Sequence, residues 1–262
     1  MRLAAVLLLM LIGFVAGCFG ALAGVGGGII VTPLLAIYFG LPMHQAIGVT
    51  LLCVIATSTA TSSQYVERHV TDVRLGMTLE LATTVGALIA ALVAHHINRR
   101  TLAVLFACFL LYSCGSLVKK AWDSRKEKRE ETIPDYTPQN YPIGLAASLI
   151  AGGFSGLLGI GGGPIKVPVM FLFMKVPLRV AAATSNFMIG VTAATSAYIY
   201  WGHGDVRIDI AAPLIAGVFA GSLLGARVSP KIRSFYILTL VVGITGWLAA
   251  QMIYKLLTGG FQ

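Results

Sequence analysis

Two glycine-rich motifs hold the residues of this chain that are best suited to bind a ligand. Residues 24–28 (Gly-Val-Gly-Gly-Gly) precede Pro33 and residues 159–163 (Gly-Ile-Gly-Gly-Gly) precede Pro168, so the motifs lie 135 positions apart. Such runs break helices, and a break leaves backbone N–H groups free at the start of the next helix, where peptide dipoles place about half a positive charge. Anions bind there without a fixed cation. The candidate donors are Gly26, Gly27, Gly28, Gly161, Gly162 and Gly163.

The composition places both motifs inside a membrane. Of 262 residues, 57% are hydrophobic and 11% charged, and the mean hydropathy is +0.85, which is too apolar for a soluble protein. An unpaired backbone group in hydrocarbon costs on the order of several kcal/mol, so a break survives only when it packs in protein or lines a polar cavity. Close helix packing is one explanation of the glycines. The repetition of the whole motif favours the other, a single binding site made from both halves.

Other function classes are disfavoured. The formal net charge is +9, yet the basic residues cluster in short connections between apolar runs, and no basic face with interleaved aromatics indicates nucleic-acid binding. The four cysteines lie in apolar runs without metal-ligand spacing, so we expect packing and neither a metal nor a cofactor. No Ser/His/Asp or Cys/His group falls on one element, so we do not expect an enzyme.

Eight apolar runs define the architecture, four in each half of the chain. They cover about residues 3–40, 44–65, 75–97, 101–118, 143–176, 178–201, 208–228 and 233–257. We therefore predict an all-α polytopic membrane protein with two homologous repeats, 1–118 and 142–262. A charged linker at 119–141 joins them, and its basic residues predict a cytoplasmic location.

The first run of each repeat is too long for one span. As a continuous helix, residues 143–176 would reach roughly 51 Å, against a hydrocarbon core of about 30 Å. We therefore predict a re-entrant or broken hairpin whose two pieces meet near mid-membrane at the glycine motif. Two topologies are possible. If each broken run returns to its starting side, the repeats are inverted; if every run crosses the membrane, they are not. The inverted topology places more of the basic residues on the linker side, so it fits the positive-inside rule better.

Two charged residues lie within apolar runs. Lys166 follows the second glycine triplet, and its counterpart in the first half is Val31. A lysine at the bilayer centre costs about 2.5–3.5 kcal/mol on insertion scales, so Lys166 either binds an anion or extends to the interface. Glu80 either carries a coupling proton or pairs with a loop arginine such as Arg74.

Polar side chains concentrate in the second run of each half. Thr50, Thr184, Ser185 and Asn186 are candidate ligand contacts. The alternative is that the hydroxyls bond to carbonyls of their own helix or to neighbouring helices. Some glycines outside the two motifs recur every four residues, and for these glycines we expect close helix packing. These are Gly13, Gly17, Gly217, Gly221 and Gly225.

The duplicated Gly-x-Gly-Gly-Gly-x4-Pro pattern, the Ala-x3-Thr-Ser segment at 181–185 and an Asp-Val-Arg after each second run resemble the sulfite exporter TauE/SafE family. The resemblance extends over nearly the full chain. It implies a multi-spanning carrier of the inner (cytoplasmic) membrane for small sulfur-containing anions such as sulfite or organosulfonates. The first half departs from the pattern because it lacks a match to Lys166 and Asn186.

Together these features predict a secondary transporter, with proton coupling as one option, that binds a small anion between the halves and rocks one half against the other. Its partners would be the anion and the lipid bilayer, without nucleic acid, and a homo-oligomer stays open. Two alternatives remain: a membrane scaffold or assembly factor without flux, and a carrier of another small solute.

Overall fold

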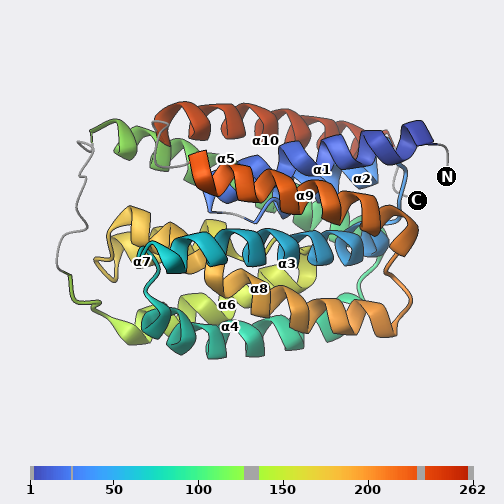
Figure 1. The fold of residues 1–262 in the computed structure, drawn as a ribbon. Helices are drawn as coiled ribbons and strands as arrows, with labels where there is room; N and C mark the ends of the chain where they lie inside the picture. Colours follow the sequence, from blue (N-terminus) through green and yellow to red (C-terminus); the bar gives the residue numbers. More distant parts are fainter. Residues whose placement is uncertain (1–2, 25, 127–135, 229–233, 259–262) are drawn as a thin grey trace.

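The structure is a computed structural model that describes residues 3–24, 26–126, 136–228 and 234–258 (Figure 1). All regular structure in these residues is helical. The helices are α1 (Leu3–Ala23), α2 (Gly28–Tyr38), α3 (Met43–Glu67), α4 (Val73–Ala94), α5 (Arg99–Lys126), α6 (Tyr141–Leu158), α7 (Gly163–Leu172), α8 (Leu178–Gly202), α9 (Ile208–Val228) and α10 (Ser234–Leu257).

The helix lengths fit a bilayer. Within the described residues, seven helices are long and apolar enough to cross a membrane, which confirms the predicted all-α polytopic class. Helix α8 is also 25 residues long but is not one of the seven; it carries many of the polar side chains. Helices α2 and α7 have 11 and 10 residues. At about 1.5 Å per residue they reach roughly half of the hydrocarbon core.

Both long first runs are broken at their glycines, as the motif predicts. Glycines on either side of each break have positive φ, which an L side chain adopts only with strain. They are Gly24, Gly26, Gly27, Gly159, Gly161 and Gly162, with φ between 70° and 84°. A Cβ at Gly20 of α1 would also lie 2.3 Å from the amide nitrogen of Gly27, so the turn needs a glycine opposite it.

The two hairpins begin at opposite ends of the bundle. Gln139 N donates to Met174 O (3.1 Å) and Asn140 Nδ2 to Phe173 O (2.9 Å), which joins the start of α6 to the end of α7. In Figure 1 the α1 and α2 hairpin starts from the other end. The inverted repeat stays a prediction, and these placements support it.

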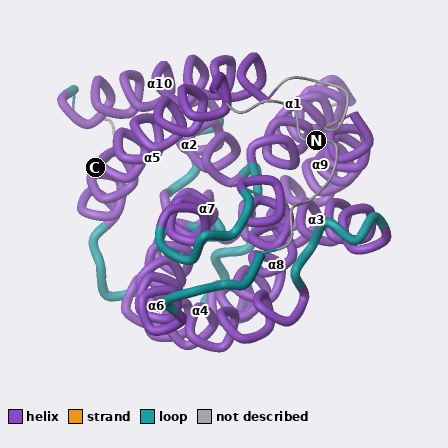
Figure 2. Tube along the Cα trace, turned by 90° about the vertical axis from the view of Figure 1, so that its left-hand side faces the viewer, coloured by secondary structure: helices purple, strands orange, loops and turns teal. Residues whose placement is uncertain are grey.

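The helices of the two repeats interlock. Helix α1 packs mainly against α9, α6 mainly against α4, and α5 against α10, while α3 and α8 contact one another between these pairs (Figure 2). Ser58 Oγ of α3 donates to Asn186 O of α8 (2.6 Å), and Gly48 packs on the carbonyl of Asp205 beyond the end of α8. The central helices α3 and α8 therefore run antiparallel.

Glycines allow the closest of these contacts. A Cβ at Gly217 would lie 2.1 Å from the carbonyl oxygen of Met10, and one at Gly221 2.0 Å from that of Phe14. Gly13, Gly17 and Gly225 lie in the same α1–α9 interface, so the packing predicted for all five is confirmed. In the α4–α6 interface, Gly152 is equally close to Thr83 O.

The linker begins later than expected. Helix α5 continues to Lys126, beyond the predicted boundary at residue 119, because the added residues are mostly Lys, Arg, Ala and Ser, which tolerate a helix. The rest of the predicted linker up to residue 135 lies outside the described residues. After it, Tyr136 Oη donates to Asp72 Oδ2 (2.9 Å), and burial together with this carboxylate raises the pKa of Tyr136.

Candidate functional site

The two glycine turns meet inside the bundle. A Cβ at Gly28 would lie 2.6 Å from Gly159 O, and one at Gly26 3.8 Å from Ile160 O. The turns come from distant parts of the chain but contact each other directly. The structure thus brings together the two triplets proposed from sequence, Gly26 to Gly28 and Gly161 to Gly163.

The crossing of the turns is filled with apolar side chains. Val54 of α3 and Ile189 of α8 are both fully buried, and each lies against Gly26 as well as Gly161. Val54 and Ile189 are also 135 positions apart, so they are matched residues of the two repeats. This pair was not predicted from the sequence, although the matched positions of Val54 and Ile189 in the two repeats are a signal that equivalent apolar residues face the two motifs.

A buried ion pair lies beside this crossing. Lys166 Nζ of α7 is 3.5 Å from Glu80 Oε2 of α4, and the two residues are only 2% and 6% exposed. Thr192 Oγ1 of α8 donates to Glu80 Oε1 at 2.5 Å, and Thr84 Oγ1 donates to the same oxygen at 3.3 Å. The site therefore joins three helices, one of which begins at the second glycine turn.

The ion pair shows that one of the two interpretations offered for Glu80, and one of the two offered for Lys166, is wrong. Glu80 contacts Lys166 and not Arg74, because it lies on the face of α4 that packs against α8. Lys166 does not extend to the interface, since its side chain is almost fully covered. Thr192 was not among the candidate site residues. Its place in the hydroxyl-rich second run was the only signal.

The ion pair is incompletely satisfied. Among the described residues, neither Lys166 Nζ nor Glu80 Oε2 has a hydrogen-bond partner, so each charge is compensated by the other at ion-pair distance. In a low-dielectric interior, loss of either partner leaves an uncompensated charge. An anion could take the place of the carboxylate beside Lys166 only if Glu80 moved or took up a proton.

The remaining polar candidates fall on different faces of α3 and α8. Thr50 Oγ1 bonds to its own helix at Ala46 O (2.7 Å), although its methyl group lies near Gly28. Thr184 Oγ1 accepts from the N–H of Asp72 (3.0 Å), which ties α8 to the start of α4. Thr184 thus serves helix packing in this structure.

Ser185 and Asn186 keep unused acceptors. Ser185 Oγ and Asn186 Oδ1 are fully buried and have no hydrogen-bond partner among the described residues. Asn186 Nδ2 donates to Ala21 O (3.4 Å), close to the first glycine turn. Successive residues of a helix project about 100° apart, so Thr184, Ser185 and Asn186 cannot line a single surface together.

A second titratable cluster lies at the opposite end of the bundle from the linker. His95 Nε2 is 3.1 Å from Asp205 Oδ2, and the ring of His95 stacks on that of His203 at 3.5 Å. Burial, followed by the nearby His203, lowers the pKa of His95. No group of three or more potential ligands suited to a metal ion occurs in the part of the chain that is described.

Comparison with known proteins agrees with this membrane architecture. The chain is 29% identical to "Probable membrane transporter protein YunE" of Bacillus subtilis (strain 168), over 95% of this chain and 97% of the relative. It is 28% identical to "Probable membrane transporter protein MJ0441" of Methanocaldococcus jannaschii, over 94% of each. No solved structure matches. The family model described as "Sulfite exporter TauE/SafE" matches residues 9–252, and the chain therefore belongs to the TauE/SafE family of membrane transporters.

Proposed function

We propose that this protein is a proton-coupled secondary transporter of small sulfur-containing anions, such as sulfite or an organosulfonate, in the inner (cytoplasmic) membrane. The observation that carries the proposal is the buried Lys166–Glu80 pair, whose lysine lies on the helix that starts at the second glycine turn. The family description supports the substrate class.

Lys166 supplies the charge for binding. It is the only buried Lys or Arg in the described residues, and it lies on the first turn of α7, near the partly positive helix N-terminus. A sulfonate or sulfite would be held by Lys166 and by N–H groups of Gly162 and Gly163, for which the described backbone offers no acceptor. These donors match the oxygens of a small oxyanion.

Glu80 provides the coupling. With its carboxylate charged, Glu80 occupies Lys166 and competes with the substrate for the same cation. With Glu80 protonated, the ammonium group needs another anion, since an unpaired buried charge is strongly unfavourable. Substrate and proton therefore enter together, and Thr192, which donates to Glu80 Oε1, helps to position the carboxyl group.

Access to the site requires the turns to separate. Val54 and Ile189 fill the crossing of the turns, so an opening motion must draw at least one of them away. Because the two strongest helix pairs, α1 with α9 and α4 with α6, each join one repeat to the other, the moving bodies are not the two sequence halves. They are α1, α2, α3 and α9 on one side and α4, α6, α7 and α8 on the other.

Flux into proteoliposomes tests the proposal. Sulfite, thiosulfate, sulfate, sulfoacetate and taurine are offered with and without an imposed pH gradient. We expect saturable flux of one anion that responds to the gradient and is lost, by at least about 100-fold, in Lys166→Ala. Arg74→Ala, which removes an exposed charge at the start of α4, is the matched control and should transport like the parent.

Glu80→Gln separates coupling from binding. This variant should still exchange labelled for unlabelled anion but should no longer accumulate it when a pH gradient is imposed. Absence of flux for every anion from folded parent protein would reject the substrate class. It would favour another solute or a scaffold without transport. Gradient-driven accumulation by Glu80→Gln equal to the parent would reject the coupling role alone.

A further inference from the structure

The second glycine turn carries a buried hydroxyl group that the first turn lacks. Ser155 of α6 corresponds to Gly20 of α1 at the offset of 135 residues. The Ser155 side chain is 0% exposed, and its Oγ has no hydrogen-bond partner within the described residues. An unsatisfied buried hydroxyl is unfavourable for the folded protein. Its place beside the proposed anion site therefore suggests that a ligand satisfies it.

The first repeat indicates which way the Ser155 side chain points. A Cβ at Gly20 would lie 2.3 Å from the amide nitrogen of Gly27 and 2.5 Å from its Cα. Gly162 is the equivalent of Gly27 in the second repeat. The three positive φ angles are 74°, 77° and 73° in the first turn and 70°, 84° and 73° in the second, so the two turns have similar backbones. The Cβ of Ser155 therefore lies beside Gly162.

Contacts within the second hairpin agree with this placement. A Cβ at Gly162 would lie 3.3 Å from Ala151 Cβ. Ala151 precedes Ser155 by four residues, so both side chains project from the same face of α6. The N–H of Gly159 donates to Ser155 O (2.8 Å), which closes the end of α6 next to the hydroxyl. Ser155 thus lies between the end of α6 and the start of α7.

Three hydrogen-bond donors then meet at the start of α7. The N–H groups of Gly162 and Gly163 have no acceptor in the described backbone, and the Ser155 hydroxyl has no partner among the described residues. Lys166, on the first turn of the same helix, adds a positive charge. Several donors beside a cation match an anion that offers several oxygens.

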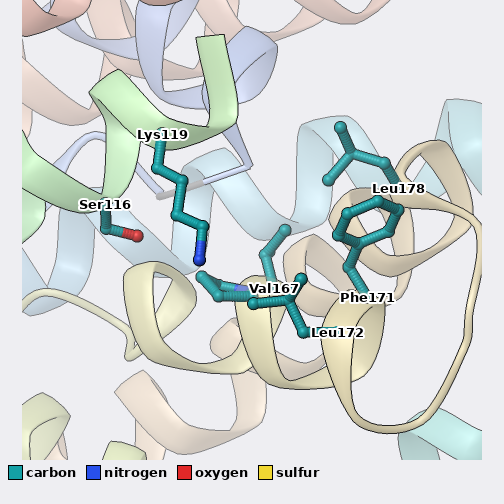
Figure 3. Close-up of a pocket in the computed structure, with 7 residues that line it drawn as sticks. Ser116, Lys119, Val167, Phe171, Leu172 and Leu178 are labelled. Carbon is teal, nitrogen blue, oxygen red and sulfur yellow. The ribbon is translucent and has the colours of Figure 1, made fainter. Parts of the chain in front are cut away.

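These donors are enclosed and do not line the pocket shown in Figure 3. That pocket lies between α5 and α7, and none of Ser155, Gly162, Gly163 and Lys166 is among its lining residues. Ser155 and Lys166 are only 0% and 2% exposed. The donors therefore become accessible to a ligand only when the glycine turns separate.

We propose that Ser155 donates a hydrogen bond to the anion at the second glycine turn and thereby favours a sulfonate over a carboxylate. This inference rests on the proposed transport function. A sulfonate has three oxygens and can accept from the two amides, Lys166 and Ser155 together. A carboxylate has only two oxygens, and a site built to bond each oxygen rejects an analogue that leaves a buried donor unpaired.

Binding of methanesulfonate and acetate tests the proposal, because the two anions differ only in the charged group. Isothermal titration calorimetry of the purified full chain in detergent, near neutral pH, measures the Kd of each probe for the parent, Ser155→Ala and Thr32→Val. We expect the parent to bind methanesulfonate more tightly than acetate. Ser155→Ala should raise the Kd for methanesulfonate by at least about tenfold and change that for acetate much less.

Thr32→Val is the matched control. Thr32 Oγ1 of α2 is also fully buried and has no hydrogen-bond partner in the part of the chain that is described, and its equivalent in the second repeat is Val167. Each substitution removes an unsatisfied buried hydroxyl, so both variants should melt at or above the temperature of the parent without ligand. Only Ser155→Ala should bind methanesulfonate more weakly, which a purely structural role does not predict.

Three results would overturn the role of Ser155 and leave the transport proposal intact. They are an unchanged Kd for methanesulfonate in Ser155→Ala, an equal rise in Kd for both probes, and a lower melting temperature of this variant without ligand. Absence of binding of both probes to folded parent protein would instead reject the anion site, and the proposed substrate class with it.

Discussion

At the scale of single residues, the buried pair of Lys166 and Glu80 has no counterpart at the equivalent positions of the other repeat. Lys166 corresponds to Val31, and Glu80 corresponds to Pro213 when aligned through the Asp-Val-Arg segments. The symmetry-related position is therefore apolar. Both repeats contribute glycine turns, but the ion pair that is buried within the described residues is held by α4, α7 and α8.

The ion pair gives a prediction for stability. Lys166→Met leaves Glu80 charged and buried and should lower the free energy of unfolding by about 3–5 kcal/mol. The double variant Glu80→Gln/Lys166→Met removes both charges and should recover at least half of that loss. Melting in detergent, followed by tryptophan fluorescence, measures both. Additive losses in the double variant would show that the two side chains do not stabilise each other.

At the scale of helices, glycine decides which pairs pack closely. The α1–α9 and α4–α6 interfaces place backbone against backbone at Gly217, Gly221 and Gly152, where even a methyl group has no room. The small-residue spacing predicted such faces from sequence. It did not identify the partner, because any helix with a smooth face and exposed carbonyls satisfies the same pattern.

Gly221→Ala tests this packing against a matched control in another helix. Its Cβ would lie 2.0 Å from Phe14 O, so α1 and α9 must separate, and overpacking of this kind costs about 1–3 kcal/mol. Gly243→Ala in α10 meets nothing within 4 Å and should melt at or slightly above the parent, because alanine favours a helix. Equal melting of the two variants would contradict the proposed interface.

At the scale of the molecule, the repeats are not separate bundles. Each first hairpin packs mainly against a helix of the other repeat, so each four-helix body contains three helices from one repeat and one from the other. A motion that rocked one sequence half against the other would pull apart the closest contacts in the protein. Movement between the mixed bodies preserves them.

Interlocking predicts the behaviour of separated halves. Fragments 1–126 and 127–262, expressed together with an affinity tag on one, should co-purify in detergent as a stable pair. Each fragment alone should be recovered in much lower yield, since α1 then lacks α9 and α6 lacks α4. Size-exclusion chromatography measures both results. Stable, monodisperse single halves would indicate independent bundles.

The sequence alone determined the membrane class, the helix boundaries to within a few residues, and the two breaks. These depend on local properties: the length and apolarity of each run against the bilayer thickness, and the backbone freedom of glycine. The linker boundary was less well predicted, because charged residues after Leu117 continue the helix of α5 as readily as they end it.

Only the tertiary structure decided which residues face one another. A polar residue in an apolar run signals that a partner exists but not where, so Glu80 could be assigned to a loop arginine until α4, α7 and α8 were placed together. The same holds for Thr192 and for Val54 with Ile189, whose roles depend on contacts between distant segments. Helical periodicity specifies the face on which a side chain lies, whereas the packing of the helices specifies what that face meets.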